Sequence, residues 1–214
     1  MKTKESIFYI IIRPIITFIF KLLYNPKIIG KENIPKTGRI VIAGNHTHNF
    51  DCILLMSSTK REIHFLAKKE LFQGLKKIIF NNLGLIPVDR QNKSPKSLTS
   101  AIKYLNDDKV IGIFPEGTTI KKKGELLPFK YGAVSMAKKT NSTIVPFAIT
   151  GKYKLRSKDL TIRYDKPLKI TENNLEESNN KLYNKVNSLI EENLIEKVLE
   201  KWFYIYCIII FFML

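Results

Sequence analysis

The chain has few of the residues from which disulfide frameworks and metal centres are made. Its 214 residues include two cysteines and three histidines. Cys52 and Cys207 are far apart in sequence and form neither a CxxC motif nor a set of paired cysteines. This excludes a disulfide-rich scaffold and favours a reducing compartment.

Acidic residues are also scarce. The chain carries 36 lysines and arginines against 19 aspartates and glutamates, a formal net charge of +17. The charge is uneven, because residues 172–214 hold seven acidic and only four basic residues. A basic body predicts an anionic partner, either a nucleic acid or a phospholipid surface. The length and a hydrophobic content of 44% predict one domain with a sizeable core.

The N-terminus is apolar but lacks the small-residue cleavage site of a secretory signal. Residues 7–24 have about the length of a membrane span, yet Arg13 and Lys21 interrupt them. Arg13, Thr17 and Lys21 are spaced by four and therefore form one polar stripe of a helix. We predict an amphipathic helix in the membrane interface, with its apolar face in lipid. The alternative is a helix buried in the core.

The middle of the chain alternates between short apolar runs and helical candidates. Runs rich in Ile, Val and Phe predict strands at 40–45, 63–68, 110–117, 143–151 and 160–165. Helices are predicted near 70–82, 94–107 and 130–140. The predicted fold class is α/β, with a mixed, largely parallel sheet flanked by helices and with sites at strand ends.

Two of the three histidines lie in the stretch NHTHNFD, Asn45–Asp51. We expect no metal here, because zinc sites usually take three or four protein ligands and only His64 remains. In an acid/base reading, Asp51 folds back onto one imidazole nitrogen of His46 and leaves the other nitrogen as a base. In a structural reading, Asn49 or Asp51 caps a helix and His46 is hydrogen-bonded in the core.

Three further sequence blocks follow this stretch. They are GLIPVDRQ (Gly84–Gln91), FPEGTTI (Phe114–Ile120) and VPFAITG (Val145–Gly151). The first of them places Asp89 and Arg90 just after a short predicted strand. In order, the patterns NHxxxxD, GxIxxDR, FPEGT and VPxxxxG resemble those of the 1-acylglycerol-3-phosphate acyltransferase (lysophosphatidic acid acyltransferase) family, within the glycerolipid acyltransferase superfamily. Four ordered blocks spanning about half the chain make the resemblance specific.

The resemblance implies roles for single residues. His46 would act as the general base and Asp51 would orient it. The implied substrate-binding residues are Arg90, which would hold the acceptor phosphate, and Glu116, Gly117, Thr118 and Lys130. The family also has a two-helix membrane-docking motif before the first block, which suits residues 7–24.

The sequence departs from the family at two positions. His48 stands where Ser is common, and it should not touch the base directly. Thr119 stands where the family usually has Arg, which removes one phosphate contact. Lys121 or Lys122 would replace that contact as a point charge, without the bidentate fork of an arginine.

Acyl transfer from a thioester to an alcohol requires a base and no enzyme nucleophile. The chain has no GxSxG elbow, and Cys52 is predicted to be a small buried thiol. The resemblance implies transfer from acyl-carrier protein or acyl-CoA to the sn-2 hydroxyl of 1-acylglycerol-3-phosphate, which makes phosphatidic acid. The thioester is a co-substrate, and no cofactor is expected.

The implied partners are anionic membrane lipids, lysophosphatidic acid and the thioester donor. The implied location is the cytoplasmic membrane, peripheral or monotopic, with the active site facing the cytosol. One alternative is another lysolipid or glycerol-phosphate acceptor. A non-enzymatic nucleic-acid-binding protein is a third reading, but the basic residues are scattered and no RNA motif such as RNP1 is present.

We divide the chain into four parts. These are a membrane-docking segment 1–36, a catalytic domain 37–171, a C-terminal helix 172–201 and an apolar tail 202–214. The helix is predicted from apolar residues that recur at intervals of three and four. The tail is too short to span a bilayer unaided. Three interpretations of this tail are open: a second membrane anchor, a helix packed into the core, or a stretch without a role at the end of the coding sequence.

Overall fold

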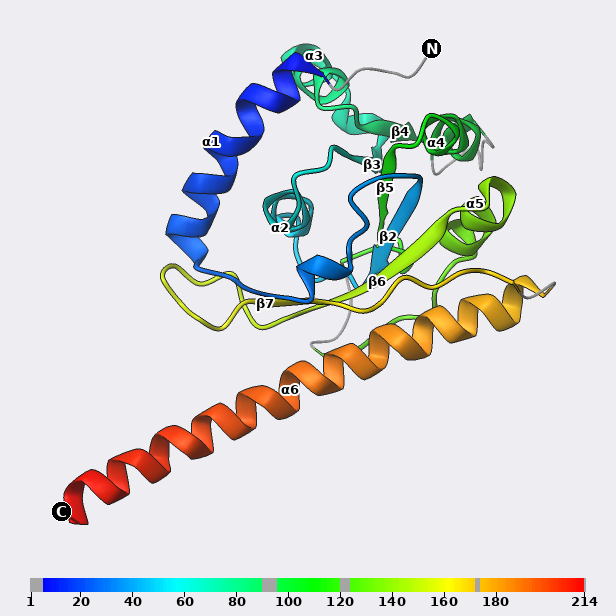
Figure 1. Ribbon diagram of the computed structural model, residues 1–214. Coiled ribbons are helices and arrows are strands. Elements are labelled where there is room, and N and C mark those ends of the chain that lie inside the picture. The colour runs from blue at the N-terminus through cyan, green and yellow to red at the C-terminus, as the bar shows by residue number, and fades with distance from the viewer. Residues whose placement is uncertain (1–5, 90–95, 120–123, 172–173, 214) are drawn as a thin grey trace.

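The computed structural model describes residues 6–89, 96–119, 124–171 and 174–213 (Figure 1). Its elements are α1 (Ile7–Tyr24), β1 (Lys27–Ile29), η1 (Lys31–Asn33), β2 (Ile40–Gly44), α2 (Asp51–Ser58), β3 (Ile63–Lys68), η2 (Lys69–Leu71), α3 (Gly74–Asn82), β4 (Ile86–Val88), α4 (Lys96–Asn106), β5 (Val110–Ile113), α5 (Gly132–Thr140), β6 (Thr143–Thr150), β7 (Thr161–Tyr164) and α6 (Leu175–Met213). Strands thus alternate with helices through the middle of the chain, as predicted.

Seven strands form one sheet in the order β1-β7-β6-β2-β5-β3-β4. Neighbouring strands run parallel, except that β7 runs antiparallel to β6. The prediction of a mixed, largely parallel sheet is therefore confirmed. All five residues of β2 are buried, which suits a central strand covered on both faces.

Helices cover both faces of the sheet (Figure 1). Because side chains alternate along a strand, Val41 and Ala43 pack with α4, α5 and α6 on one face. Ile40 and Ile42 point to the other face and pack with residues of α1 and α2, including Leu54. The core is therefore split by the sheet into two apolar layers.

The structure shortens one predicted strand and adds one that was missed. The run 110–117 was predicted as one strand, but β5 ends at Ile113 because the chain turns there. The backbone N–H of Gly117 donates to the Phe114 carbonyl at 3.0 Å, and Gly117 has a φ of +73°, in the left-handed region that favours glycine. The missed strand, β1, has only three residues and pairs with β7.

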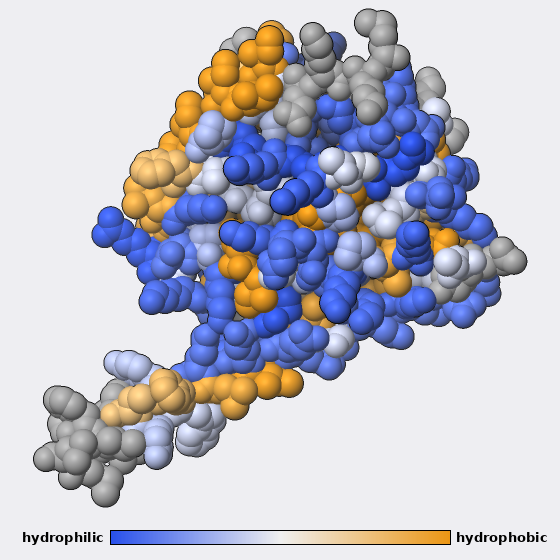
Figure 2. Space-filling view, in the orientation of Figure 1, coloured by the Kyte–Doolittle hydropathy of each residue, from blue (hydrophilic) through white to orange (hydrophobic). Residues whose placement is uncertain are grey.

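In the polar stripe of α1, Arg13 and Thr17 are partly buried against the protein, whereas Lys21 is exposed. Arg13 Nε donates to the carbonyl of Met56 at 3.2 Å, and its Nη2 donates to the carbonyl of Thr59, both at the C-terminal end of α2. The outward face of α1 is apolar and exposed (Figure 2), and comprises Ile7, Ile10, Ile11, Ile15, Phe18, Ile19, Leu22 and Leu23. By length and composition alone, α1 could cross a membrane.

The C-terminal region is one continuous helix. The 39 residues of α6 run through position 201 without a break and extend away from the body of the protein (Figure 1). Ion pairs fix its middle, because Lys27 pairs with Glu196 at 2.9 Å and Arg163 also pairs with Glu196. The side chains of residues 202–207 are exposed, so this part of the tail is not packed into the core.

Candidate active site

The sequence blocks meet at the carboxyl edge of the parallel sheet. His46 follows β2, Asp89 follows β4 and Glu116 follows β5. Tyr153 follows β6, which is parallel to β2. Parallel strands point their carboxyl ends to the same edge, where α/β proteins place their ligands. The sheet thus brings together residues that are far apart in the sequence.

Asn45 sets the direction in which the chain leaves β2. Its side-chain Nδ2 donates to the carbonyl of Ile149 at 2.8 Å, and the N–H of Ile149 donates to Asn45 Oδ1 at 2.7 Å. The buried amide therefore fastens the end of β2 to β6. The loop that follows starts from a fixed point, which fixes the place of His46.

His46 and Asp51 form a hydrogen-bonded pair. His46 Nδ1 lies 2.7 Å from Asp51 Oδ2, and Asp51 is 0% exposed. The same oxygen accepts the backbone N–H of Thr47 at 2.6 Å and that of His48 at 2.9 Å. Asp51 is the first residue of α2, where the positive end of the helix dipole favours a carboxylate.

These contacts keep Asp51 ionised. Burial by itself would raise the pKa of the carboxyl group. Hydrogen bonds from His46, from the Tyr153 hydroxyl and from the backbone N–H groups of His48 and Thr47 outweigh burial and leave the pKa lowered. An ionised Asp51 accepts a hydrogen bond from the N–H at His46 Nδ1, which leaves Nε2 with a lone pair and able to act as a base.

The backbone and the ring of His46 are held by the FPEG segment. Phe114 stacks on the imidazole with ring centroids 4.0 Å apart and planes 12° apart. Glu116 Oε1 accepts the backbone N–H of His46 at 2.7 Å, and Oε2 accepts that of Leu127 at 2.9 Å. Glu116 is 4% exposed. It therefore lies behind the loop and ties β5 to His46.

A cleft of about 550 Å³ opens beside the imidazole. It is lined by His46, Leu66, Val88, Asp89, Ser97, Ile113, Phe114, Pro115, Gly117, Lys130 and Gly132. One part of the lining is apolar, and the other carries a carboxylate, an ammonium group and the imidazole. Such a cleft suits a ligand with an apolar portion and a charged end.

The predicted substrate-binding residues lie in different surroundings. Gly117 and Lys130 both line the cleft. A Cβ at Gly117 would stand 2.9 Å from Lys130 Nζ, so a side chain there would compete with the ammonium group. Thr118 is partly buried beside Gly117 and is not among the cleft-lining residues. Arg90, Lys121 and Lys122 lie outside the described residues.

Cys52, the second residue of α2, is partly buried and not fully buried as predicted. Burial, followed by the neighbouring Asp51 carboxylate, raises the pKa of the Cys52 thiol to about 12. A thiol with so high a pKa is protonated at neutral pH and is a poor nucleophile. The ring of His48 stacks on Tyr153, with centroids 4.6 Å apart.

The sequence-based prediction missed several residues of the site. Tyr153 donates to Asp51 Oδ1, and Thr47 Oγ1 donates to the same oxygen at 3.1 Å. Phe114 lies within the FPEG block, but the resemblance implies no role for its ring. The FPEG block was a signal for Phe114, whereas nothing in the sequence connects Tyr153 with Asp51.

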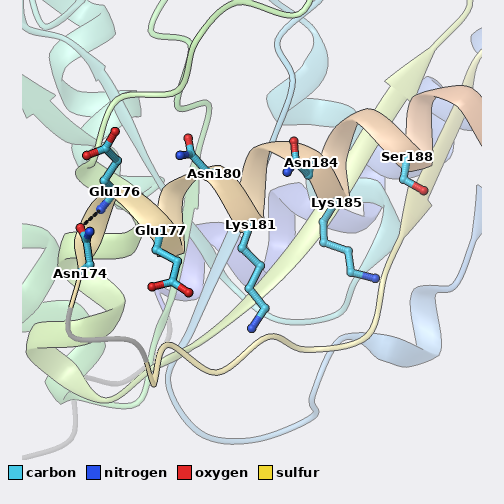
Figure 3. Close-up of a pocket in the computed structure, with 8 residues that line it drawn as sticks. All are labelled: Asn174, Glu176, Glu177, Asn180, Lys181, Asn184, Lys185 and Ser188. Atoms are coloured by element: carbon cyan, nitrogen blue, oxygen red, sulfur yellow. Dashed lines mark hydrogen bonds between the residues drawn. The ribbon is translucent and has the colours of Figure 1, made fainter.

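A larger hollow, of about 770 Å³, lies elsewhere on the surface (Figure 3). It is lined by Asn174, Glu176, Glu177, Asn180, Lys181, Asn184, Lys185 and Ser188. All of these come from the first half of α6 and its preceding residue. The hollow is a polar helix surface and includes none of the sequence blocks. Among the described residues, no three His, Cys, Asp or Glu side chains are grouped so as to hold a metal ion.

Comparisons with known proteins find similar sequences and a similar fold. A family model described as Acyltransferase matches residues 25–150. The chain is 39% identical over 132 residues to the 1-acyl-sn-glycerol-3-phosphate acyltransferase of Bacillus subtilis strain 168, covering 58% of this chain and 62% of the relative. It is 33% identical over 123 residues to the protein of that name from Borreliella burgdorferi, covering 56% and 49%.

A solved structure shares the fold. The 1-acyl-sn-glycerophosphate (LPA) acyltransferase PlsC from Thermotoga maritima matches with a TM-score of 0.70 at 22% identity, covering 85% of this chain and 79% of that one. The curated relatives are longer than the matched region, and this chain spans 62% of the length of the first and 49% of the second. The matched residues include the first three blocks and all of the fourth except Gly151.

Proposed function

This chain belongs to the acyltransferase family, and on that premise we propose that it acylates the sn-2 hydroxyl of 1-acylglycerol-3-phosphate to form phosphatidic acid. The observation that carries the proposal is the His46–Asp51 pair, 2.7 Å apart, beside a cleft with apolar and charged parts. Relatives named for this reaction support the choice of acceptor.

In the proposed reaction, His46 Nε2 accepts the proton of the sn-2 hydroxyl as its oxygen attacks the thioester carbonyl. The buried Asp51 carboxylate stabilises the imidazolium that forms. The tetrahedral intermediate then collapses, and the carbon–sulfur bond breaks. The departing thiolate takes the proton from the imidazolium, so the base is regenerated and the products are an ester and a free thiol.

The charged part of the cleft suits the acceptor phosphate. Lys130 lines the cleft and supplies a point charge for a phosphate oxygen. We assign Arg90 to the same phosphate from its place in the GxIxxDR block, directly after Asp89, which lines the cleft. Gly117 leaves space for Lys130, while Glu116 contributes by holding the backbone of His46. Thr118 adjoins this group.

We place the enzyme on the cytoplasmic face of a membrane, as a peripheral or monotopic protein. The support is the exposed apolar face of α1 (Figure 2) and the net charge of +17, which suits anionic lipids. The end of α6 serves as a second anchor. From Leu194 to Tyr206 it exposes apolar side chains that include Trp202, Tyr204 and Tyr206, a composition common at membrane interfaces.

The test is identification of lipid products. The purified chain is incubated with lysophosphatidate and an equal mixture of acyl-carrier-protein and CoA thioesters, and lipids are analysed by mass spectrometry. We expect phosphatidic acid, and the donor that is consumed identifies the physiological thioester. Acylation of lysophosphatidylcholine or glycerol-3-phosphate in preference to lysophosphatidate would replace the acceptor assignment. Absence of any acylated product would contradict the proposed function.

A further inference from the structure

Tyr153 contacts the catalytic carboxylate from the side opposite His46. Its hydroxyl donates to Asp51 Oδ1, whereas His46 Nδ1 bonds Oδ2 at 2.7 Å. A carboxylate held by donors on both oxygens cannot rotate about its Cβ–Cγ bond without breaking a hydrogen bond. Together with Thr47 Oγ1, which donates to the same oxygen at 3.1 Å, the Tyr153 hydroxyl therefore restrains the orientation of the carboxylate that bonds the imidazole.

The ring of Tyr153 lies at the centre of an aromatic cluster. Its centroid is 6.2 Å from that of Phe20 and 5.7 Å from that of Tyr24, both on α1. It is 4.6 Å from His48 and 6.1 Å from Phe50, both in the loop that carries His46. The Tyr153 side chain thus contacts α1, the loop that carries His46 and the Asp51 carboxylate.

The backbone reinforces this connection. The N–H of Arg156, three residues after Tyr153, donates to the carbonyl of Leu23 at 2.6 Å. The loop that carries Tyr153 is therefore hydrogen-bonded to the last turn of α1. A displacement of α1 would therefore move this loop and, with it, the Tyr153 hydroxyl that donates to Asp51.

We propose that Tyr153 is a positioning residue that holds the Asp51 carboxylate against His46 and that itself rests on α1. Through this contact, the position of α1 is coupled to the geometry of the base. Burial, and then the nearby Asp51 charge, raises the pKa of Tyr153, so the hydroxyl remains a donor at neutral pH. The change in kcat expected on removing the Tyr153 hydroxyl rests on the proposed function, whereas the change expected in the His46 imidazole does not.

The first variant is Tyr153→Phe, which keeps the ring and removes the donor. Its matched control is Tyr164→Phe, because Tyr164 is also buried and its hydroxyl bonds Ser58 in the last turn of the same helix, α2. We expect Tyr153→Phe to lower kcat by about 10- to 100-fold with both KM values unchanged, since a hydrogen bond to a charged group is lost. Tyr164→Phe should leave kcat unchanged. Equal losses in the two variants would make Tyr153 a structural residue and overturn the proposal.

A second measurement is independent of activity. The chain has three histidines, so the imidazole signals of ¹⁵N-histidine-labelled protein can be assigned with single His→Gln variants. In the wild type we expect His46 to carry its proton on Nδ1. In Tyr153→Phe we expect the ¹⁵N shifts of the His46 ring to move, because the carboxylate that bonds Nδ1 is less restrained, whereas an unchanged spectrum would overturn the proposal. A changed spectrum in a protein that makes no phosphatidic acid would refute the proposed function and leave the role of Tyr153 standing.

The contact with α1 is tested by a double-mutant cycle. Removing the ring of Tyr24 in Tyr24→Ala should lower kcat on detergent-dispersed substrate by about 2- to 10-fold, the range of one aromatic contact. If Tyr24 acts through Tyr153, the double variant with Tyr153→Phe should lose less than the product of the two single effects. Losses that multiply would show that α1 does not act through Tyr153.

Discussion

Replacing Asp51 by asparagine separates the charge of this residue from its shape. Oδ2 of Asp51 accepts three N–H groups, from His46, Thr47 and His48. An asparagine fits best with its carbonyl oxygen in that place and its amide group toward Thr47 Oγ1 and Tyr153. His46 Nδ1 then still donates, and the tautomer is preserved. The variant therefore loses chiefly the negative charge that faces the imidazolium in the transition state.

The expected loss of rate in Asp51→Asn follows from the distance between the carboxylate and the imidazolium. With Nδ1 and Oδ2 at 2.7 Å, the centres of the two charges lie about 4 Å apart. At an effective dielectric constant of about 20, their attraction is about 4 kcal/mol, which corresponds to about a thousandfold in rate. The assay is thiol release from the thioester donor at saturating lysophosphatidate. A loss of less than about tenfold would refute the electrostatic role of Asp51.

The same variant alters the dependence of stability on pH. The folded state lowers the pKa of Asp51, so its stabilising contribution is present above the ordinary carboxyl pKa and is lost as pH falls through the folded value. We expect the wild type to lose stability more steeply than Asp51→Asn below about pH 4, measured by urea unfolding between pH 3 and pH 7. Parallel curves would show that Asp51 has the same pKa in the folded and unfolded chains.

Three further predictions concern the phosphate site, the dependence on metal and the C-terminal tail. Arg90→Ala should raise KM for lysophosphatidate more than KM for the thioester, because a charge-assisted contact to phosphate is worth about 1.5–3 kcal/mol; an equal rise in both would remove Arg90 from the phosphate site. EDTA should leave the rate unchanged, since the base is an imidazole, and activity lost in EDTA and restored by zinc would require a metal-dependent mechanism. Truncation after Lys201 should weaken binding to anionic vesicles and spare activity on detergent-dispersed lysophosphatidate, because the four blocks precede it; a folded but inactive truncated protein would assign the tail to the active site.

Local patterns predicted most of the strands and the His46–Asp51 hydrogen bond, because both depend on residues close in sequence. Alternating apolar runs predict strands, and the spacing from His46 to Asp51 places both groups in one loop and helix start. Contacts between distant segments could not be read in this way. Tyr153 and Asp51 are separated by 102 positions, and Glu116 and His46 by 70.

The orientation of α1 is another feature that local sequence patterns do not predict. Helical spacing predicts that Arg13 and Thr17 share one stripe, but it does not say which way the stripe faces. The guanidinium of Arg13 points inward because the carbonyls of Met56 and Thr59 at the end of α2 offer acceptors. The apolar face is therefore the one left on the surface, as a membrane-docking helix requires.

The most direct test of the account is His46→Ala, assayed for both thiol release and phosphatidic acid formation, with folding checked by circular dichroism. The imidazole is partly exposed in the cleft and carries the proton in the proposed step. We expect both products to vanish while the spectrum of the folded protein is retained. Turnover close to that of the wild type in a folded His46→Ala protein would contradict the assignment of His46 as the base.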